Sequence, residues 1–155
     1  MPEIGQKAPA FSLYDTEKTK VSLEDFLGKK VLLLFFPLAF SSVCTKELCS
    51  VRDGITAYNN LNAVVLGISV DSIYTLKKFK EDQSLTFTLL SDFNKEISKA
   101  YDALYDLFSL GMKGVSKRAA FVIDQQGVLQ YKEVLNNSGE LPDFIAIKKV
   151  LESIA

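Results

Sequence analysis

Long apolar runs without alternation mark the buried strands of this 155-residue chain. Residues 31–36 and 63–70 are almost wholly apolar, and Pro37 ends the first run. Such runs are typical of parallel strands that are covered on both faces. Shorter strands are predicted over residues 86–90, 119–123 and 128–134, the last two forming a hairpin. We therefore expect residues 31–36 to form a central strand.

Apolar residues at steps of three and four predict the helices. One such stripe consists of Leu48, Val51, Ile55 and Tyr58. It predicts a helix over residues 42–59 that lays this face on the sheet. Further helices are expected over residues 23–27, 72–83 and 95–104 and from Pro142 onward, and a short hairpin over residues 10–13 and 20–22.

The order of these elements predicts the fold class. An N-terminal β-hairpin precedes alternating strands and helices, a second hairpin and a last helix. This order predicts an α/β domain with a mixed central sheet and helices on both faces, compatible with a thioredoxin-like fold. Glycines and prolines are scattered singly and no repeat or linker interrupts the chain. We therefore expect one domain over residues 1–155.

Composition excludes several kinds of function. The chain has 18 Lys+Arg against 19 Asp+Glu, a net charge of -1 and no histidine. The balanced charge argues against a nucleic-acid partner. The lack of histidine excludes a Ser-His-Asp triad, a Cys-His dyad and imidazole-bound zinc or haem. Two cysteines supply at most half of a structural zinc site, so we expect neither a metal nor another cofactor.

Hydropathy and cysteine content bear on the compartment. The longest strongly apolar run has about ten residues, whereas a membrane-spanning helix needs about 20. Residues 1–10 lack an apolar segment of signal-peptide length. We therefore expect a cytoplasmic protein with no membrane partner. Thiols are normally reduced there, so the cysteine pair is expected to react rather than to brace the fold.

The chemistry is expected at residues 36–49, where the central strand ends and a helix begins. Ligands in open α/β sheets bind outside the carboxyl ends of strands. Cys44 falls in the first helical turn, where unpaired N–H groups and the positive end of the helix dipole stabilise a thiolate. By helical phase its sulfur faces the domain, whereas Cys49 lies roughly 130° from the apolar stripe. The alternative is that both cysteines are small apolar fillers of the core.

The spacing of four residues in this segment resembles a known pattern. They are Pro37, Ser41, Cys44 and Glu47. The peroxiredoxin family (alkyl hydroperoxide reductase/thiol-specific antioxidant) has proline, three residues, Thr or Ser, two residues, a reactive cysteine and then Glu.

Three other segments resemble the same family. Residues 5–11 resemble its entry sequence, and residues 117–124 resemble the strand that carries its second active-site arginine. Residues 36–40, together with residues 47–48, resemble the alkyl hydroperoxide reductase E type. A type related to bacterioferritin-comigratory protein, with cysteines five positions apart, is the other candidate subgroup.

The resemblance implies a thiol-dependent peroxidase in which Cys44 is the peroxidatic thiolate and becomes a sulfenic acid. Ser41 would contact the peroxide oxygens, and Pro37 would shield the sulfur from water. Arg118 would hold the negative charge with its fixed fork of donors. Taken singly, Pro37 could simply end a strand, Ser41 could cap a helix and Arg118 could be a surface charge.

Three further expectations concern the neighbouring residues. The resemblance implies that Glu47 orients an arginine, and Arg52 is a candidate for the one it holds. It also implies that Cys49 resolves the sulfenic acid as a disulfide, which a thioredoxin-like dithiol then reduces. Helical residues five apart have Cα atoms roughly 8 to 9 Å apart, and a disulfide needs about 7 Å or less. Disulfide formation therefore requires residues 42–50 to unwind.

Alternatives remain at this point. An external thiol could reduce Cys44 directly, or Cys44 could serve a non-enzymatic redox sensor. A thiol-disulfide oxidoreductase is disfavoured because the chain has no C-x-x-C. The family resemblance implies a homodimer built around the active site, and residues 107–112 are a candidate contact, a flap over the pocket or part of the core.

Overall fold

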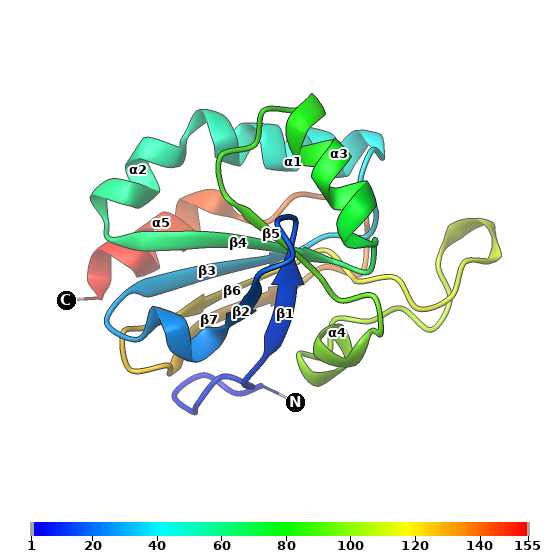
Figure 1. Ribbon diagram of the computed structural model, residues 1–155. Helices are drawn as coiled ribbons and strands as arrows, with labels where there is room; N and C mark the ends of the chain where they lie inside the picture. The colour runs from blue at the N-terminus through cyan, green and yellow to red at the C-terminus, as the bar shows by residue number, and fades with distance from the viewer. Residues whose placement is uncertain (1, 155) are drawn as a thin grey trace.

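The computed structural model describes residues 2–154, which fold around one seven-stranded mixed sheet (Figure 1). The strands are β1 (Ser12–Asp15), β2 (Lys20–Ser22), β3 (Lys30–Phe35), β4 (Ala63–Ser69), β5 (Thr88–Ser91), β6 (Ala119–Ile123) and β7 (Leu129–Val134). Their order across the sheet is β2-β1-β5-β4-β3-β6-β7. β3, β4 and β5 are parallel, whereas β6 runs antiparallel to β3 and β1 antiparallel to β5. The N-terminal hairpin thus extends the sheet at one edge.

Helices cover both faces of the sheet. They are η1 (Leu23–Phe26), α1 (Ser42–Asp53), α2 (Ile55–Asn60), α3 (Ile73–Asp82), α4 (Glu96–Ala100), η2 (Ser109–Gly111) and α5 (Phe144–Ser153). α1, α2, α3 and α5 lie on one face, and α4 lies on the other (Figure 1). The predicted α/β class, mixed sheet and two-sided helical cover are confirmed.

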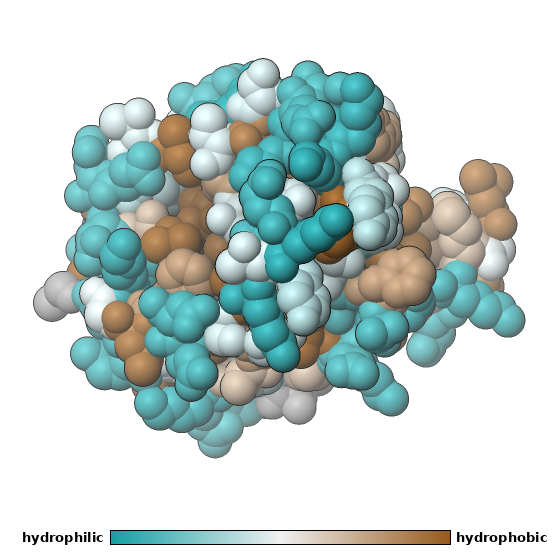
Figure 2. Space-filling view, viewed as in Figure 1, coloured by the Kyte–Doolittle hydropathy of each residue, from teal (hydrophilic) through white to brown (hydrophobic). Residues whose placement is uncertain are grey.

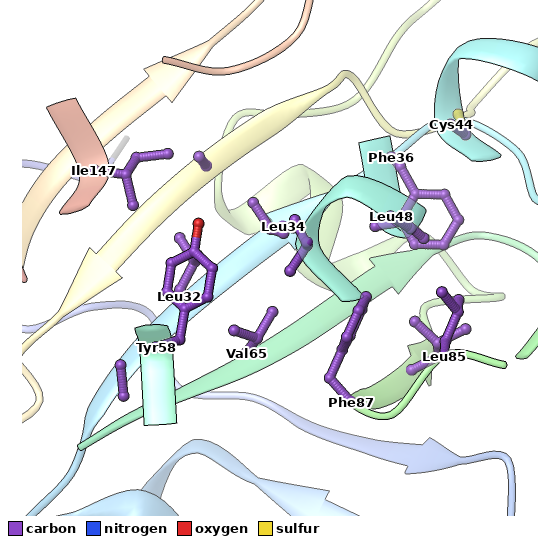
Figure 3. Packing of buried hydrophobic residues seen from close by; sticks show 14 of the residues in the cluster. Leu32, Leu34, Phe36, Cys44, Leu48, Tyr58, Val65, Leu85, Phe87 and Ile147 are labelled. Atoms are coloured by element: carbon purple, nitrogen blue, oxygen red, sulfur yellow. The ribbon is translucent and has the colours of Figure 1, made fainter. Parts of the chain in front are cut away.

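β3 divides the core into two layers, because successive side chains of a strand point to opposite faces. All six of its residues are buried. Leu32, Leu34 and the following Phe36 pack beneath α1 and α2 (Figure 3). Leu33 and Phe35 pack on the opposite face. The prediction of a central strand covered on both sides is confirmed.

The predicted helix over residues 42–59 is wrong in one respect, because the structure breaks it at Gly54. This residue has φ −100° and ψ 14°, outside the helical range, and separates α1 from α2. Glycine is a poor helix former, so the apolar stripe continues across a break in the backbone. α4 ends at Ala100, short of the predicted residue 104, and Asp102 just beyond it has a left-handed φ of 55°.

The loops after β3 and β4 and the segment before β6 shape the functional region. The Ala39 amide donates to the Asp71 carboxylate at 2.8 Å, which ties the loop after β3 to the loop after β4. Residues 104–116, here called the arm, project from the body as a narrow hairpin (Figure 1). No helix within residues 2–154 is long and apolar enough to cross a membrane.

Candidate active site

A hollow of about 110 Å³ opens at the N-terminus of α1, where β3 ends. The Cys44 side chain lies at this hollow and is only 1% exposed. Figure 3 shows Cys44 on the first turn of α1, above Phe36 and Leu48. The hollow is lined by Pro37, Leu38, Ser41, Ser42, Val43, Cys44, Phe108, Arg118 and Ser138. The small volume suits a substrate of few atoms at the sulfur.

Arg118 directly precedes β6 and brings a cation to the Cys44 sulfur. Its Nη2 donates to Cys44 Sγ at 3.3 Å, and its Nη1 donates to Glu47 Oε1 at 2.6 Å. Nε and Nη2 both donate to the Ser138 carbonyl, at 3.3 and 3.0 Å. The side chain is 1% exposed. Three partners therefore fix the plane of the guanidinium before any substrate arrives.

Burial disfavours the charged form of both Glu47 and Arg118, which pair with each other. Glu47 is fully buried, and within residues 2–154 its Oε2 has no hydrogen-bond partner. Burial raises the pKa of Glu47 to about 7, although the charge and hydrogen bond of Arg118 act to lower it. Burial also lowers the pKa of Arg118, but the charges of Glu47 and Cys44 outweigh it and leave that pKa above its ordinary value. Arg118 therefore stays charged across the physiological range.

Ser41 and Pro37 lie at the rim of the hollow. Ser41 is the N-cap residue of α1, and its hydroxyl donates to the Leu38 carbonyl at 2.7 Å. Within the described chain no side chain caps this helix end, so the first-turn N–H groups, those of Val43 and Cys44 among them, have no side-chain acceptor. Pro37 is buried two residues after the end of β3 and forms part of the wall.

Cys49 and Arg52 point away from the hollow, toward the end of α3. Cys49 is half-buried, and its Sγ donates to Gln83 Oε1 at 3.4 Å. Arg52 donates to the Gln83 carbonyl and pairs with Asp53 at 2.9 Å. The prediction that Glu47 holds Arg52 is therefore wrong, because Glu47 pairs with Arg118 instead.

The structure brings together five of the residues singled out from sequence, and it adds others. Pro37, Ser41, Cys44, Glu47 and Arg118 surround or adjoin one hollow.

Sequence reasoning missed Ser138 and Asp71, whereas Phe108 lies in the segment 107–112 that was named as a candidate flap over the pocket. Asp71 directly follows a buried strand, a signal that was available. Ser138 acts through its backbone carbonyl, which no side-chain pattern reveals. In the part of the chain that the structure describes, no group of three or more Cys, Asp or Glu side chains is placed to hold a metal ion.

Comparison with known proteins identifies the family. The family model described as AhpC/TSA family matches residues 4–132. A curated relative named putative peroxiredoxin bcp, from Coxiella burnetii, is 42% identical over 129 residues, which are 82% of this chain and 85% of the relative.

Solved structures give the same result. The crystal structure of peroxidoxin BcpB from Mycobacterium tuberculosis superimposes with a TM-score of 0.86 at 28% identity, covering 100% of this chain and 99% of the other. The reduced 2-Cys peroxiredoxin of Plasmodium vivax gives a TM-score of 0.83 at 33% identity, covering 97% and 80%. The thioredoxin-like fold is thereby confirmed. The chain belongs to the AhpC/TSA family, and it is a peroxiredoxin, a thiol-dependent peroxidase.

Proposed function

We propose that Cys44 is the peroxidatic residue and that it reduces a hydroperoxide held in the 110 Å³ hollow. The thiolate sulfur attacks one oxygen of the peroxide, and the O–O bond breaks. Cys44 becomes a sulfenic acid, and the second oxygen leaves as water or an alcohol after taking a proton. One observation carries this proposal: Arg118, 74 positions further along the chain, donates to the Cys44 sulfur at 3.3 Å.

The surrounding groups stabilise the charge that moves from sulfur to the departing oxygen. Arg118 and the first-turn amides of α1 supply fixed donors, which need no rearrangement during the reaction. Ser41 gives its only hydroxyl proton to the Leu38 carbonyl. Its free lone pairs can therefore accept the O–H of the bound peroxide and orient it. These roles require no cofactor.

Pro37 and Glu47 act on the reacting groups from outside. Pro37 is a buried wall residue without an N–H group, so it excludes water from the sulfur without competing for it. Glu47 does not line the hollow. It fixes Nη1 of Arg118 and thereby leaves Nη2 directed at Cys44.

Cys49 is proposed as the resolving residue. Both cysteines lie in the intact helix α1 and both are free thiols. Residues five apart in such a helix are roughly 8 to 9 Å apart at Cα, beyond the reach of about 7 Å that a disulfide has. The oxidised protein is therefore expected to unwind residues 42–50, and a thioredoxin-like dithiol would reduce the resulting disulfide.

Stopped-flow oxidation tests these assignments with the wild type, Cys44→Ser and Cys49→Ser. Cys44→Ser is expected to consume no hydroperoxide, whereas Cys49→Ser should react once and accumulate sulfenic acid. A wild type that yields a persistent sulfenic acid or an intermolecular bridge would contradict resolution by Cys49 and favour an external thiol. Turnover with a dithiol present separates the enzyme from a one-reaction sensor. Hydrogen peroxide and a bulky alkyl hydroperoxide, compared side by side, rank the substrates.

The proposal also covers the domain, the compartment and the oligomeric state of the protein. Residues 1–155 act as one domain, in support of which all seven strands join one sheet. The cycle needs a reducing compartment, so we place the protein in the cytoplasm. Two copies associate as a homodimer through the arm, where Leu107 is 63% and Leu110 96% exposed. Figure 2 shows the apolar tip of the arm standing clear of the body.

A further inference from the structure

We propose that Gln83 is a positioning residue that holds α1 closed and so slows disulfide formation. The inference rests on the proposed resolving role of Cys49. It concerns the balance between two fates of oxidised Cys44: disulfide formation with Cys49 and further oxidation by peroxide.

Gln83 makes two contacts with α1 from one position. Its side-chain Oε1 accepts the thiol hydrogen bond of Cys49 at 3.4 Å. Its backbone carbonyl accepts from Nη1 of Arg52. Cys49 and Arg52 are three positions apart and therefore lie on one side of the helix. Gln83 thus contacts α1 at two positions on the side that faces the end of α3, and we call this set of contacts the clasp.

The clasp is attached to α3, a helix that packs into the core. Gln83 is the C-cap residue of α3, and its amide donates to the Phe79 carbonyl at 3.0 Å. Phe79 and Leu76 on the same helix are fully buried in the core. The end of α3 is therefore fixed relative to the sheet, and any unwinding of α1 at Cys49 must break the bond to Gln83.

The other end of the unwinding segment is held at Cys44 by Arg118. This contact changes when the sulfur is oxidised, because the anionic sulfur becomes a sulfenic acid. The clasp does not change at that moment, since Cys49 and Gln83 take no part in the peroxide step. It therefore remains as a barrier to opening after the first step has finished.

Two reactions then compete for the sulfenic acid. In one, the Cys49 sulfur attacks the Cys44 sulfur, the S–O bond breaks, and the hydroxyl leaves as water with the proton of Cys49. In the other, a second hydroperoxide oxidises the sulfenic acid to a sulfinic acid and is itself reduced to water or an alcohol. The first reaction needs α1 open, whereas the second proceeds with α1 closed. A stronger clasp shifts the outcome toward the sulfinic acid.

The test compares Gln83→Ala with two other variants. Gln83→Ala removes the acceptor for Cys49 and keeps the backbone carbonyl for Arg52. Gln83→Glu keeps an acceptor oxygen, so it should form the disulfide no faster than the wild type does. Gln126→Ala makes the same truncation on an exposed turn far along the chain and serves as the control. Each reduced protein is mixed with one equivalent of hydrogen peroxide, quenched with an alkylating reagent and weighed by mass spectrometry.

The expected result is that Gln83→Ala forms the 44–49 disulfide about five times faster, the factor for one net hydrogen bond. Its rate of peroxide consumption should equal that of the wild type. In excess peroxide it should yield less sulfinic acid than the wild type and Gln126→Ala. Amide hydrogen exchange of the reduced protein should rise over α1 in Gln83→Ala alone. A general loss of stability would instead raise exchange throughout the sheet.

Two outcomes would overturn the inference, and they are distinguishable. If the wild type forms the disulfide and Gln83→Ala forms it no faster than Gln126→Ala does, the clasp is refuted while the proposed function stands. If the wild type consumes peroxide without any 44–49 disulfide, the resolving role of Cys49 fails and the clasp fails with it.

Discussion

At the scale of single residues, the guanidinium of Arg118 joins the helix that carries Cys44 to the loop that carries Ser138. It contacts a sulfur, a carboxylate and a backbone carbonyl that come from two separate parts of the chain. Nε, Nη1 and Nη2 all take part in these contacts, and only a fixed fork of donors can serve three partners at once. An ammonium group at this position would keep the charge and lose the geometry.

We expect Arg118→Met to lower the second-order rate of Cys44 oxidation by about 100-fold or more, the usual loss when one preorganised donor is removed. Arg118→Lys should fall between this variant and the wild type. Stopped-flow kinetics with hydrogen peroxide measures the effect. Lys117→Met is the control, because Lys117 lies next in the chain but contacts the Tyr105 ring instead. Equal losses in both variants would contradict the role of Arg118.

The raised pKa of Glu47 predicts how the free energy of unfolding varies with pH. Its pKa is raised from 4.5 to about 7 in the folded protein, so the folded state holds the proton more tightly than the unfolded state does. The free energy of unfolding should therefore fall as the pH rises from about 4.5 to 7, by roughly 3 kcal/mol at most. Below pH 4.5 and above pH 7 this contribution is constant.

Chemical denaturation of the wild type and of Glu47→Gln across this range provides the measurement. The variant keeps an acceptor for Arg118 but cannot ionise. The free energy of unfolding of the wild type, relative to that of Glu47→Gln, should therefore fall between pH 4.5 and 7 and stay constant outside that range. A difference that is flat with pH would show that the carboxyl titrates at its ordinary value.

At the scale of elements, the sequence predicts what is buried more reliably than where each element ends. The apolar runs over residues 31–36 and 63–70 become β3 and β4 within one residue at each end. The helix stripe is also confirmed, but the backbone break at Gly54 was missed. Side-chain periodicity records which face packs on the sheet. It does not reveal a break in the backbone that leaves the same face buried.

Two glycines offer a matched pair for testing packing. A Cβ at Gly67 in β4 would lie 2.7 Å from Leu89 Cδ2 and 3.4 Å from Phe36, both fully buried. Gly67→Ala should therefore cost about 1 to 3 kcal/mol of stability through overpacking. A Cβ at Gly54 would meet nothing closer than 3.7 Å, and its φ of −100° suits any residue.

Urea denaturation compares the two substitutions. Gly54→Ala should lie within about 1 kcal/mol of the wild type, on the stabilising side, because alanine restricts the unfolded chain. Should Gly67→Ala prove as stable as Gly54→Ala, the close packing of β4 under Phe36 would be wrong.

At the scale of the whole molecule, the arm is the feature that sequence patterns explain least. Its residues 107–112 are apolar, and a core position was one reading of them. The structure excludes that reading for Leu107 and Leu110, which are exposed, while Phe108 reaches the hollow. Contacts that depend on the path of a loop, such as the Ser138 carbonyl on Arg118, are equally hidden in sequence. The site motif itself was predictable, because its residues lie within one strand-to-helix turn.

The proposed homodimer predicts the effect of a charge at the tip of the arm. Leu110→Asp should convert a dimer into a monomer, because it buries a carboxylate in an apolar contact. Sedimentation velocity at micromolar concentration measures the change. Ile145→Asp adds the same charge to α5, where Ile145 is 72% exposed, and should leave the dimer intact. A wild type that sediments as a monomer at every concentration would refute the proposal.

The distance along the chain between Cys44 and Arg118 has a consequence for biosynthesis. The cysteine leaves the ribosome 74 residues before its cation does. Until β6 joins β3, the sulfur lacks the guanidinium donor of Arg118. We therefore expect the nascent polypeptide to react slowly with peroxide, and the fast reaction to arise only once the sheet has closed.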